Sequence, residues 1–418
     1  MPRIERRLRV GLAVTAALVV AATSACASKA GGSTSDPIKV AHPLPLTGVY
    51  AANGKDLQSG FEIGLKEFGS EVNGRKIEVT FADTQGDPAT ALTTVRKLIQ
   101  DGAQVVQGPM ATNEIAAVAP LLAQNGIPVN DLGLCSAAQL DSWAKTGNGF
   151  TSGYSCDQTA LVAAEWAYNE MKWRHITLPA LDYSWGWATA GGFKSAFEKL
   201  GGKIDKEIWI PNTAADLSSY VTQIPKDTDA VFAAVAGAFS VKFINAYKSF
   251  GLTGKIPVFG VTPLIDGSIL PTMDPAATEG VYAGAQYCDG IDTPENKKFV
   301  ETYHAANKRY PGYYAEAAYV RAQVLVSALK ARNGDASDHK AMAKAMKQVT
   351  INAPRGPVSI SDKSFSPIQN IYICQVKMVN GELRSIPIKT YEKVPPQGNV
   401  LDYATWEKNF KRYTQARP

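Results

Sequence analysis

The sequence IKVAHPLPLTGVYAANGKDLQSGFEIGLKEF, residues 38–68, begins with a β-rich run at residues 38–42 and ends in an amphipathic helical pattern at residues 55–68. The loop between them is rich in glycine, proline and small polar residues. A β-rich run, a loop and a helical pattern, in this order, form the repeating unit of sheets built from parallel strands. The rest of the chain repeats this unit.

The unit recurs in two series, at residues 38–155 and 157–284, and two more helical patterns and a strand-rich end follow. A chain of 418 residues also exceeds the roughly 250 to 300 residues that one hydrophobic core usually serves. We therefore predict an α/β protein of two lobes, each a mostly parallel sheet flanked by helices. Because the late elements must join one or both lobes, we expect the chain to cross between the lobes more than once and so to form a hinge.

Each predicted lobe combines two pieces of the chain. The N-terminal lobe is expected to contain residues 38–155 plus 285–365, and the C-terminal lobe residues 156–284 plus 366–390. Residues 391–418 form a C-terminal tail. Helical spacing in this tail places four aromatic side chains on one face, where we expect them to pack on the body: Tyr403, Trp406, Phe410 and Tyr413.

Residues 1–25 have the features of a signal peptide, with four arginines before an apolar run at residues 10–22. This run is shorter than the ~20 residues that span a bilayer. Cys26 ends the sequence TSAC, which resembles a lipobox, although ACA at residues 25–27 also fits cleavage for free secretion. Without Cys26 the other four cysteines are an even set. We expect a lipoprotein on the outer face of the cytoplasmic membrane, tethered by residues 26–37, with a secreted or periplasmic protein as the alternative.

Charge and motifs exclude several classes of protein. The net charge is +5, but residues 1–25 hold four of the 43 basic and one of the 38 acidic side chains, which leaves +2 for the rest. This balance argues against a nucleic-acid partner. The sequence has no HExxH, GxSxG, Walker A or CxxC motif. We therefore expect a protein that is not an enzyme and that holds no metal and no cofactor.

The loops that follow the strands are candidate binding elements, because ligands of parallel α/β sheets bind beyond the carboxyl ends of the strands. One such loop is GPMATNE, residues 108–114, in which Thr112 and Asn113 can cap the following helix. The free amides of such a helix start bind anions such as carboxylates. The alternative is an ordinary cap with water as its ligand.

Aromatic residues gather in a loop of the second series, LDYSWGWATAGG at residues 181–192. Exposed aromatic side chains at a strand end suit an apolar or ring-shaped ligand held between lobes. We predict a ligand contact for Tyr183 or Trp185, and packing of the next helix for Trp187. Later strand ends add three candidates: Phe239, Thr262 and Asp266.

From about residue 38 to residue 381 the chain resembles the type I periplasmic-binding-protein family, in particular the leucine/isoleucine/valine-type substrate-binding subunits of ABC transporters. Beyond residues 38–68, the resemblance is carried in order by NGRKIEVTFADTQGDPATA, VVQGPMATNEIAAVAPLLAQNGIPV, DYSWGWA and DAVFAAVAGAFSVKFINAYKSFGL. It implies two hinged lobes that capture a small solute and present it to a membrane permease.

The resemblance also implies roles for single residues. The family's carboxylate-binding loop matches residues 108–114, so Thr112 would supply a hydroxyl contact, with a second contact near Cys135. Three more contacts are implied by the family's YG pair, its later wall residue and its first cleft loop: Trp185, Phe239 and Asn53.

One of two departures from the family concerns the ligand. Amino-acid-binding members use an acidic residue for the ligand's ammonium, but Thr262 stands at this position, with Asp266 four residues later. An unpaired buried ammonium is costly. Either Asp266 reaches the ligand or the ligand lacks an ammonium, and we favour a carboxylate with an aromatic or other apolar body, or an amide, over leucine.

Cysteines supply the other departure. Cys135 replaces the family's usual threonine and Cys156 begins the second series, so we predict a disulfide beside the cleft. Cys288 and Cys374 lie in strand-like segments near later crossovers and are also predicted to pair. Buried free thiols are the alternative.

We therefore expect the substrate-binding protein of a branched-chain-amino-acid-type ABC importer, which captures a small carboxylate, amino acid, amide or aromatic acid. It should be a monomer whose partners are permease subunits and, through a lipid anchor, the membrane. The alternative is a ligand-sensing ectodomain that reports to a membrane signalling receptor. A secreted hydrolase lacks a recognisable nucleophile and base, and a repressor conflicts with the signal peptide.

Overall fold

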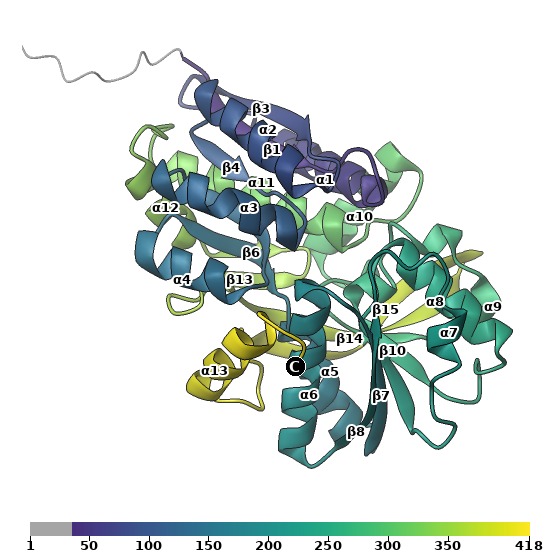
Figure 1. Ribbon diagram of the computed structural model, residues 1–418. Coiled ribbons are helices and arrows are strands. Elements are labelled where there is room, and N and C mark those ends of the chain that lie inside the picture. The colour runs from purple at the N-terminus through teal and green to yellow at the C-terminus, as the bar shows by residue number, and fades with distance from the viewer. Residues whose placement is uncertain (1–35) are drawn as a thin grey trace, which may run out of the picture. The chain divides into compact units, whose positions relative to one another are not determined.

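The structure is a computed structural model that describes residues 36–418. The predicted signal peptide, the predicted lipidation site Cys26 and most of the predicted tether lie outside the described residues. The described chain folds on two β-sheets, each covered by helices, with connections that pass repeatedly between them (Figure 1). The predicted class, a two-lobed α/β protein with mostly parallel sheets, is confirmed.

The first lobe is built on a six-stranded sheet in the order β2-β3-β1-β4-β5-β6. All neighbouring strands are parallel except β2 and β3. The strands are β1 (Ile38–Leu44), β2 (Glu71–Val72), β3 (Arg75–Asp83), β4 (Val105–Gln107), β5 (Val129–Leu134) and β6 (Gly149–Ser155).

Helices cover both faces of this sheet, because its strands are apolar on both sides. Side chains from helices α2 and α3 pack on one face around Val106, and those from α1 pack on the other face around Val105. Gly60 lets α1 approach α11 closely, since a Cβ there would lie 1.9 Å from the Ala315 carbonyl oxygen. The helices are α1 (Ala51–Phe68), α2 (Pro88–Gln100), α3 (Thr112–Gln124), α4 (Ala137–Thr146), α10 (Pro294–Asn307), α11 (Tyr313–Ala331) and α12 (His339–Lys347).

The second lobe is built on a nine-stranded sheet in the order β12-β13-β14-β11-β10-β9-β7-β8, with β15 paired to β14. Strands β7 to β11 are parallel, and the rest pair in antiparallel fashion. The strands are β7 (His175–Leu181), β8 (Lys203–Ile210), β9 (Ala230–Ala233), β10 (Val258–Val261), β11 (Tyr282–Ala285), β12 (Ile351–Ala353), β13 (Gly356–Ile360), β14 (Pro367–Val379) and β15 (Glu382–Val394).

An aromatic core joins the second sheet to its helices. Phe193 of α6 stacks on Phe232 of β9 with ring centroids 4.0 Å apart, and Phe232 contacts Phe259 of β10. Helices α5 and α6 cover this face, and Figure 1 shows α7, α8 and α9 on the other side of the strands. The helices are α5 (Gln158–Asn169), α6 (Ser184–Leu200), α7 (Ser218–Val221), α8 (Ala238–Ser249) and α9 (Pro275–Thr278), with 3₁₀ turns at Thr262–Leu264 and Leu270–Thr272.

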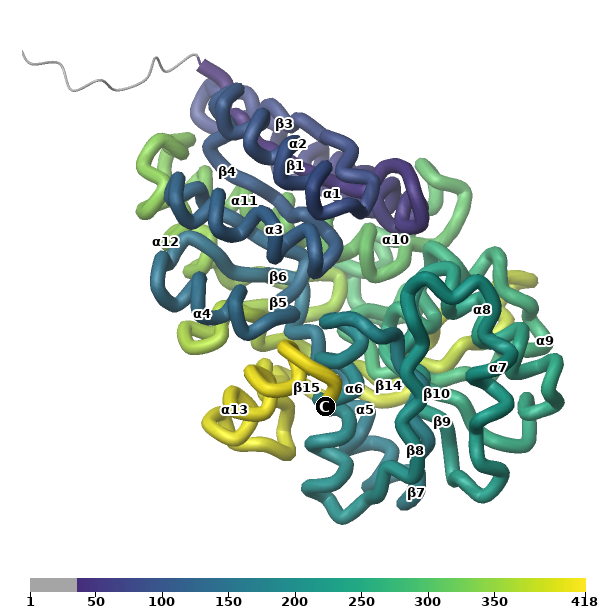
Figure 2. Tube along the Cα trace, in the orientation of Figure 1, coloured from purple at the N-terminus to yellow at the C-terminus, as the bar shows by residue number. Residues whose placement is uncertain are grey.

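The chain passes between the lobes at several points, as the tube in Figure 2 shows. It leaves the first sheet after β6, returns from β11 to α10, and enters the second sheet again at β12 and β13. β13 also contacts β6, so these segments lie where the two lobes meet. The residue limits expected for each lobe stay a prediction.

The C-terminal tail contains one further helix, α13 (Tyr403–Tyr413), which packs on α6 and α4. Trp406, Phe410 and Tyr413 on this helix are fully buried, as the spacing of the aromatic residues predicts.

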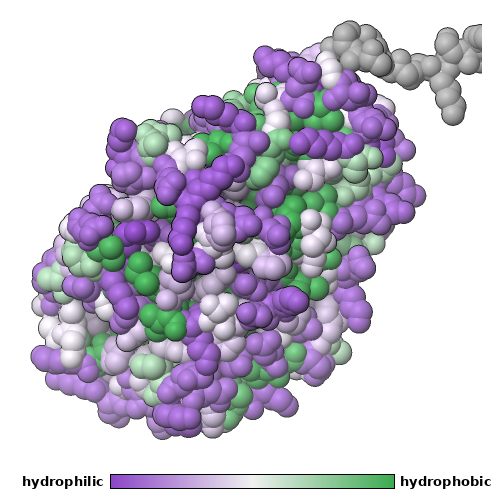
Figure 3. Space-filling view, turned by 180° about the vertical axis from the view of Figure 1, so that it is seen from behind, coloured by the Kyte–Doolittle hydropathy of each residue, from purple (hydrophilic) through white to green (hydrophobic). Residues whose placement is uncertain are grey.

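Most large apolar side chains of the described residues are buried, and the exposed ones are scattered: Val49, Phe250, Met378 and Ile388. In Figure 3, hydrophobic groups on the visible face are small and mixed with hydrophilic residues. Among the helices of residues 36–418, none combines the length and apolar character needed to cross a membrane.

Candidate ligand-binding cleft

A cavity of about 510 Å³ lies between the two lobes. The first lobe contributes residues from the start of α1, the loops after β4 and β5, strand β6 and helix α11, and the second lobe contributes the loops after β7, β8 and β9. Most of these loops follow the carboxyl ends of parallel strands, where ligands of parallel α/β sheets bind. The volume is within the range of small-molecule sites.

Three helices of the two lobes begin at this cavity. Thr112, Ser184 and Ala238 are the first residues of α3, α6 and α8, and all three line the cavity. The first amides of a helix have no partner within the helix, and the helix dipole favours negative charge at this end. The cavity therefore offers several backbone donors to an anionic group.

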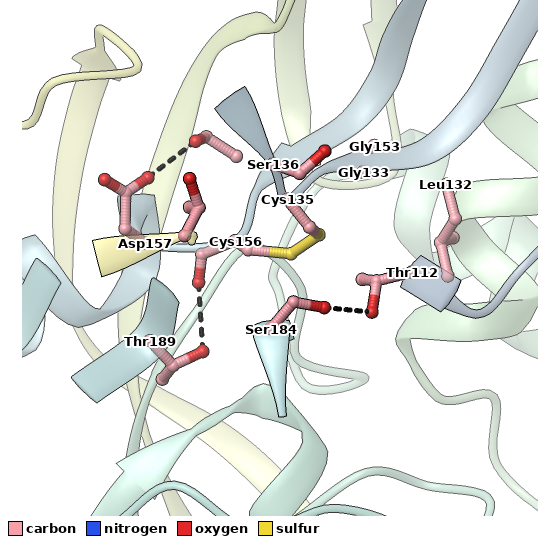
Figure 4. Close-up of a disulfide and its surroundings, with 12 residues drawn as sticks. Thr112, Leu132, Gly133, Cys135, Ser136, Gly153, Cys156, Asp157, Ser184 and Thr189 are labelled. Atoms are coloured by element: carbon pink, nitrogen blue, oxygen red, sulfur yellow. Dashed lines mark hydrogen bonds between the residues drawn. A yellow bond between two sulfur atoms is a disulfide. The ribbon is translucent and has the colours of Figure 1, made fainter. Parts of the chain in front are cut away.

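Thr112 is not the N-cap of α3, although the sequence suggested that it could be. The N-cap of α3 is Ala111, and the Ala111 amide donates to the Glu114 carboxylate at 3.0 Å. The Thr112 hydroxyl is instead 2.9 Å from the Ser184 hydroxyl (Figure 4). Because α3 belongs to the first lobe and α6 to the second, this hydrogen bond connects the lobes at the cavity.

The aromatic loop after β7 faces the same cavity. Tyr183 and Trp185 stack with ring centroids 6.2 Å apart, and both line the cavity. Phe239, at the start of α8, lines it from the same lobe. The Trp187 indole donates to the Asp182 carboxylate at 2.9 Å and does not line the cavity, which agrees with the packing role expected for it.

Sequence reasoning missed three tyrosines of the first lobe. Tyr50, Tyr154 and Tyr314 also line the cavity, from the loop before α1, from β6 and from α11. Burial raises the pKa of Tyr314 and raises the pKa of Tyr154 to about 12. The phenols are therefore neutral at physiological pH and can donate hydrogen bonds. Tyr50 lies in a loop that the sequence singled out, whereas nothing local marks the other two.

Negative charge is absent from the cavity wall. Among the residues that line this cavity, the one charged side chain is Lys242, an exposed residue whose Nζ lies 5.4 Å from the Phe239 ring centroid. Among residues 36–418, no aspartate or glutamate lines it. Residues 36–418 also contain no group of His, Cys, Asp or Glu suited to a metal ion. The cavity is thus aromatic and without a lining carboxylate among the described residues, with donors for an anion.

Both predicted disulfides are present. Cys135 follows β5 and Cys156 follows β6, and their Cα atoms are 5.0 Å apart (Figure 4). Cys135 lines the cavity, so this disulfide borders the ligand site. Cys288 pairs with Cys374 of β14, with 6.4 Å between the Cα atoms.

Three other predicted contacts lie outside the cavity wall. The Asn53 amide donates to the Ser268 hydroxyl at 3.0 Å, and the Thr262 hydroxyl donates to Gln286 at 2.6 Å. The Asp266 carboxylate accepts from the backbone amides of Ser268 and Tyr313, at 2.9 and 2.7 Å, and is buried. Asp266 therefore holds the start of α11 in place, and its carboxylate is occupied by these donors.

A cleft between two hinged α/β lobes, lined by aromatic rings and helix starts, is the binding site of a solute-binding protein. The family model described as "Periplasmic binding protein" matches residues 37–382. The chain belongs to this family.

Relatives in sequence and solved structures agree with this assignment. The Leu/Ile/Val-binding protein homolog 6 of Brucella melitensis biotype 1 is 30% identical over 373 residues, which cover 87% of this chain and 94% of that protein. An ABC transporter substrate-binding protein from Sphaerobacter thermophilus has 29% identity and a TM-score of 0.80, over 85% of this chain and 98% of its own. A solute-binding protein from Rhodopseudomonas palustris BisB5, solved with 3,4-dihydroxybenzoic acid, has 28% identity and a TM-score of 0.81, over 87% and 99% of the two chains.

Proposed function

We propose that this protein is the extracytoplasmic substrate-binding component of an ABC importer, and that its substrate is an aromatic carboxylate without an ammonium group. The observation that carries the proposal is the cavity itself, which has aromatic walls and anion-binding helix starts but no aspartate or glutamate. Membership of the periplasmic binding protein family supports the transport role.

The carboxylate of the ligand would lie between the starts of α3 and α6. There the hydroxyl groups of Thr112 and Ser184 are within reach of one another. The first amides of both helices have no carbonyl partner within their helix, and of these the Glu114 amide donates to the Asn113 side chain. Hydrogen bonds to a charged acceptor are stronger than those between neutral groups. This arrangement favours an anion that bridges the two lobes.

The ring of the ligand would lie among the aromatic side chains. Tyr183, Trp185 and Phe239 line the cavity from one lobe, with tyrosines from the other, and aromatic pairs gain from offset or edge-to-face contact. An amino acid would place its ammonium group in a cavity whose wall has no carboxylate among the described residues. This positive charge would then be buried without a partner. Solved relatives from Rhodopseudomonas palustris, at 28% and 26% identity, hold 3,4-dihydroxybenzoic acid and benzoate, which supports the same substrate class.

Closure of the lobes would couple capture to transport. A ligand that contacts both lobes stabilises the closed state by its higher affinity for that state. The closed form would then dock on the permease subunits, which are the proposed protein partners of a monomer. Cys26 is the proposed lipid attachment site. A Cys26→Ser variant should be released from the membrane, and a variant that stays membrane-bound would rule this attachment out.

Calorimetry tests the substrate class. We expect saturable binding of benzoate or 4-hydroxybenzoate and no binding of leucine. Tight leucine binding without binding of aromatic acids would overturn the proposal. Mass spectrometry of the small molecule that co-purifies with the protein gives an independent identification.

A further inference from the structure

The C-terminal segment, residues 402–418, lies beyond the part of the chain that the family model matches, which ends at residue 382. Its helix α13 is nevertheless fully docked, because Trp406, Phe410 and Tyr413 each have 0% of their surface exposed. Figures 1 and 2 show this helix in yellow beside α4 and α6, and both contacts are present in the structure. The segment therefore touches both lobes.

Its contacts with the first lobe are made to α4. The Lys411 ammonium is 2.9 Å from the Asp141 carboxylate. The Ala137 amide, in the first turn of α4, donates to the Thr414 hydroxyl at 3.0 Å. This second bond is buried and satisfies a helix-start amide that has no partner within α4.

Its contacts with the second lobe converge on Asp157, which follows the hinge strand β6. The Trp406 indole donates to the Asp157 carboxylate at 2.7 Å, and the Tyr413 hydroxyl donates to the same oxygen. Ser155, the last residue of β6, donates to the other carboxylate oxygen at 2.6 Å. One buried carboxylate thus ties the tail to the strand along which the chain passes between the lobes.

Two glycines of α6 make room for this contact. A Cβ at Gly191 would lie 2.3 Å from Tyr413, and a Cβ at Gly192 would lie 2.5 Å from the Asp157 Cβ. Glycine in a helix interior is less favourable than alanine. The close approach of the tail and of Asp157 gives a reason for two successive glycines in this helix.

The last residues of the segment reach the cleft loop itself. The Arg417 guanidinium forms a two-pronged ion pair with Asp182, whose Oδ1 is 2.9 Å from Arg417 Nε and also accepts from the Trp187 indole. Asp182 directly precedes Tyr183 and Ser184, which line the cavity. The tail therefore contacts the base of one of the loops through which the second lobe lines the ligand site.

We propose that residues 402–418 influence ligand binding by stabilising one arrangement of the two lobes and by positioning the aromatic loop after β7. The helix α13 braces the two lobes beside the hinge, and Arg417 positions the Asp182 end of the aromatic loop. Opening of the lobes changes the distance between α4 and the second lobe. Because α13 contacts both α4 and the second lobe, its contacts favour the lobe arrangement in which they can all form. The residues of the brace act through this arrangement and do not contact the ligand.

Point variants separate bracing from folding, since removal of the whole segment would expose three buried rings and Asp157. Lys411→Ala with Thr414→Val removes the ion pair and the hydrogen bond to α4, and keeps the hydrogen bonds of Trp406 and Tyr413 to Asp157 and the Arg417–Asp182 ion pair. The matched control is Lys408→Ala with Gln415→Ala, two changes at exposed positions of the same segment. For the loop, Arg417→Gln is compared with Arg412→Gln, the same change at an exposed position nearby.

Two measurements need no ligand. In small-angle scattering of the free protein, the Lys411/Thr414 variant should have a larger radius of gyration than wild type and control. In hydrogen exchange, Arg417→Gln should speed exchange of the Tyr183 and Trp187 amides, which donate to the Leu181 and Tyr183 carbonyls, by about fivefold or more. An unchanged radius of gyration would overturn the proposal that α13 braces the lobes. Unchanged exchange would overturn the proposal that Arg417 positions the loop.

The third measurement is affinity, and it alone rests on the proposed function. With 4-hydroxybenzoate as the probe, the Lys411/Thr414 variant should bind about three- to tenfold more weakly than the control, since the closed state is less populated. Equal affinity of variant and control, with wild-type binding intact, would count against the brace. If wild type does not bind the probe, the proposed substrate class fails while scattering and exchange still decide the role of the segment.

Discussion

Thr112 and Ser184 join the two lobes through a hydrogen bond of 2.9 Å between their hydroxyl oxygens, at the point where helices α3 and α6 both begin. Each hydroxyl stands beside amides that have no partner within their helix. A carboxylate placed here accepts from both lobes at once. The two residues that connect the lobes directly are therefore also suited to hold them together through a ligand.

Removal of either hydroxyl should weaken ligand binding. Thr112→Val and Ser184→Ala each remove one donor to the carboxylate, and a hydrogen bond to a charged group contributes about 1.5–3 kcal/mol. We expect affinity for 4-hydroxybenzoate to fall about tenfold or more in calorimetry. Thr112→Ser should bind like wild type because it keeps the hydroxyl.

The control for these variants is Thr93→Val, at an exposed position on α2 that does not line the cavity. An equal loss of affinity in the control would point to a general effect on folding. If both Thr112→Val and Ser184→Ala bind with wild-type affinity, the ligand's carboxylate must bind in another part of the cavity.

Lys242 should act on the rate of association. It is the one charged side chain among the residues lining the cavity, and it is exposed at the rim. A rim charge mainly changes the association rate, because it attracts the ligand over a distance that salt shortens. We expect Lys242→Gln to slow association of an aromatic carboxylate about two- to fivefold at low ionic strength in stopped-flow fluorescence. At high salt the difference should vanish, and a salt-independent loss would indicate direct contact instead.

The strand-end rule predicted part of the candidate site. Thr112, Tyr183, Trp185 and Phe239 line the cavity, because the carboxyl ends of parallel strands meet at one edge of each sheet, whereas Thr262 and Asp266 do not line it. Cys135, which the family resemblance indicated, lines it as well. This rule needs no tertiary information beyond the order of strands and helices. The same order also gave the two-lobed α/β class.

The remaining site residues depend on packing between distant parts of the chain. Tyr154 reaches the cavity from within β6, and Tyr314 from a helix that follows a return crossover, so no strand-end rule marks them. Asp266 has the chemistry to bind an ammonium, but the Tyr313 amide at the start of α11 takes its carboxylate. A local sequence pattern cannot report such a long-range partner. The paired glycines of α6 are a local signal of close approach, but only the structure identifies Tyr413 as the neighbour.

The two disulfides should differ in what they support. They close loops with sequence separations of 21 and 86 residues, so chain entropy assigns them about 3 and about 4.5 kcal/mol of stability. We expect the alanine pair at Cys288 and Cys374 to lower the free energy of unfolding more than the alanine pair at Cys135 and Cys156. Ligand affinity should fall only in the Cys135/Cys156 double variant, because Cys135 lines the cavity. Denaturant titration measures the loss of stability in both double variants, and calorimetry measures their ligand affinity. A larger loss of stability in the Cys135/Cys156 variant, with a loss of affinity in the Cys288/Cys374 variant, would refute these roles.

Asp157 should make stability depend on pH. Burial raises its pKa to about 6, although Ser155, Tyr413 and Trp406 donate hydrogen bonds that act in the opposite direction. A raised pKa in the folded state means that folding favours the protonated carboxyl. The resulting stabilisation is fully present below the unfolded value of 3.8 and is lost as the pH rises through about 6.

Asp157→Asn removes this titration and keeps an oxygen that can accept from Trp406 and Tyr413. Relative to wild type, the variant should therefore gain about 2 kcal/mol in the free energy of unfolding between pH 4.5 and pH 7.5, with little further change above pH 7.5. Urea titrations at a series of pH values measure this difference, and Asp362→Asn makes the same change on an exposed side chain as the control. A difference between wild type and Asp157→Asn that stays constant with pH would mean that the carboxylate titrates alike in the folded and unfolded chains. A difference of the opposite sign would mean that the three donors outweigh burial and keep Asp157 ionised beneath α13.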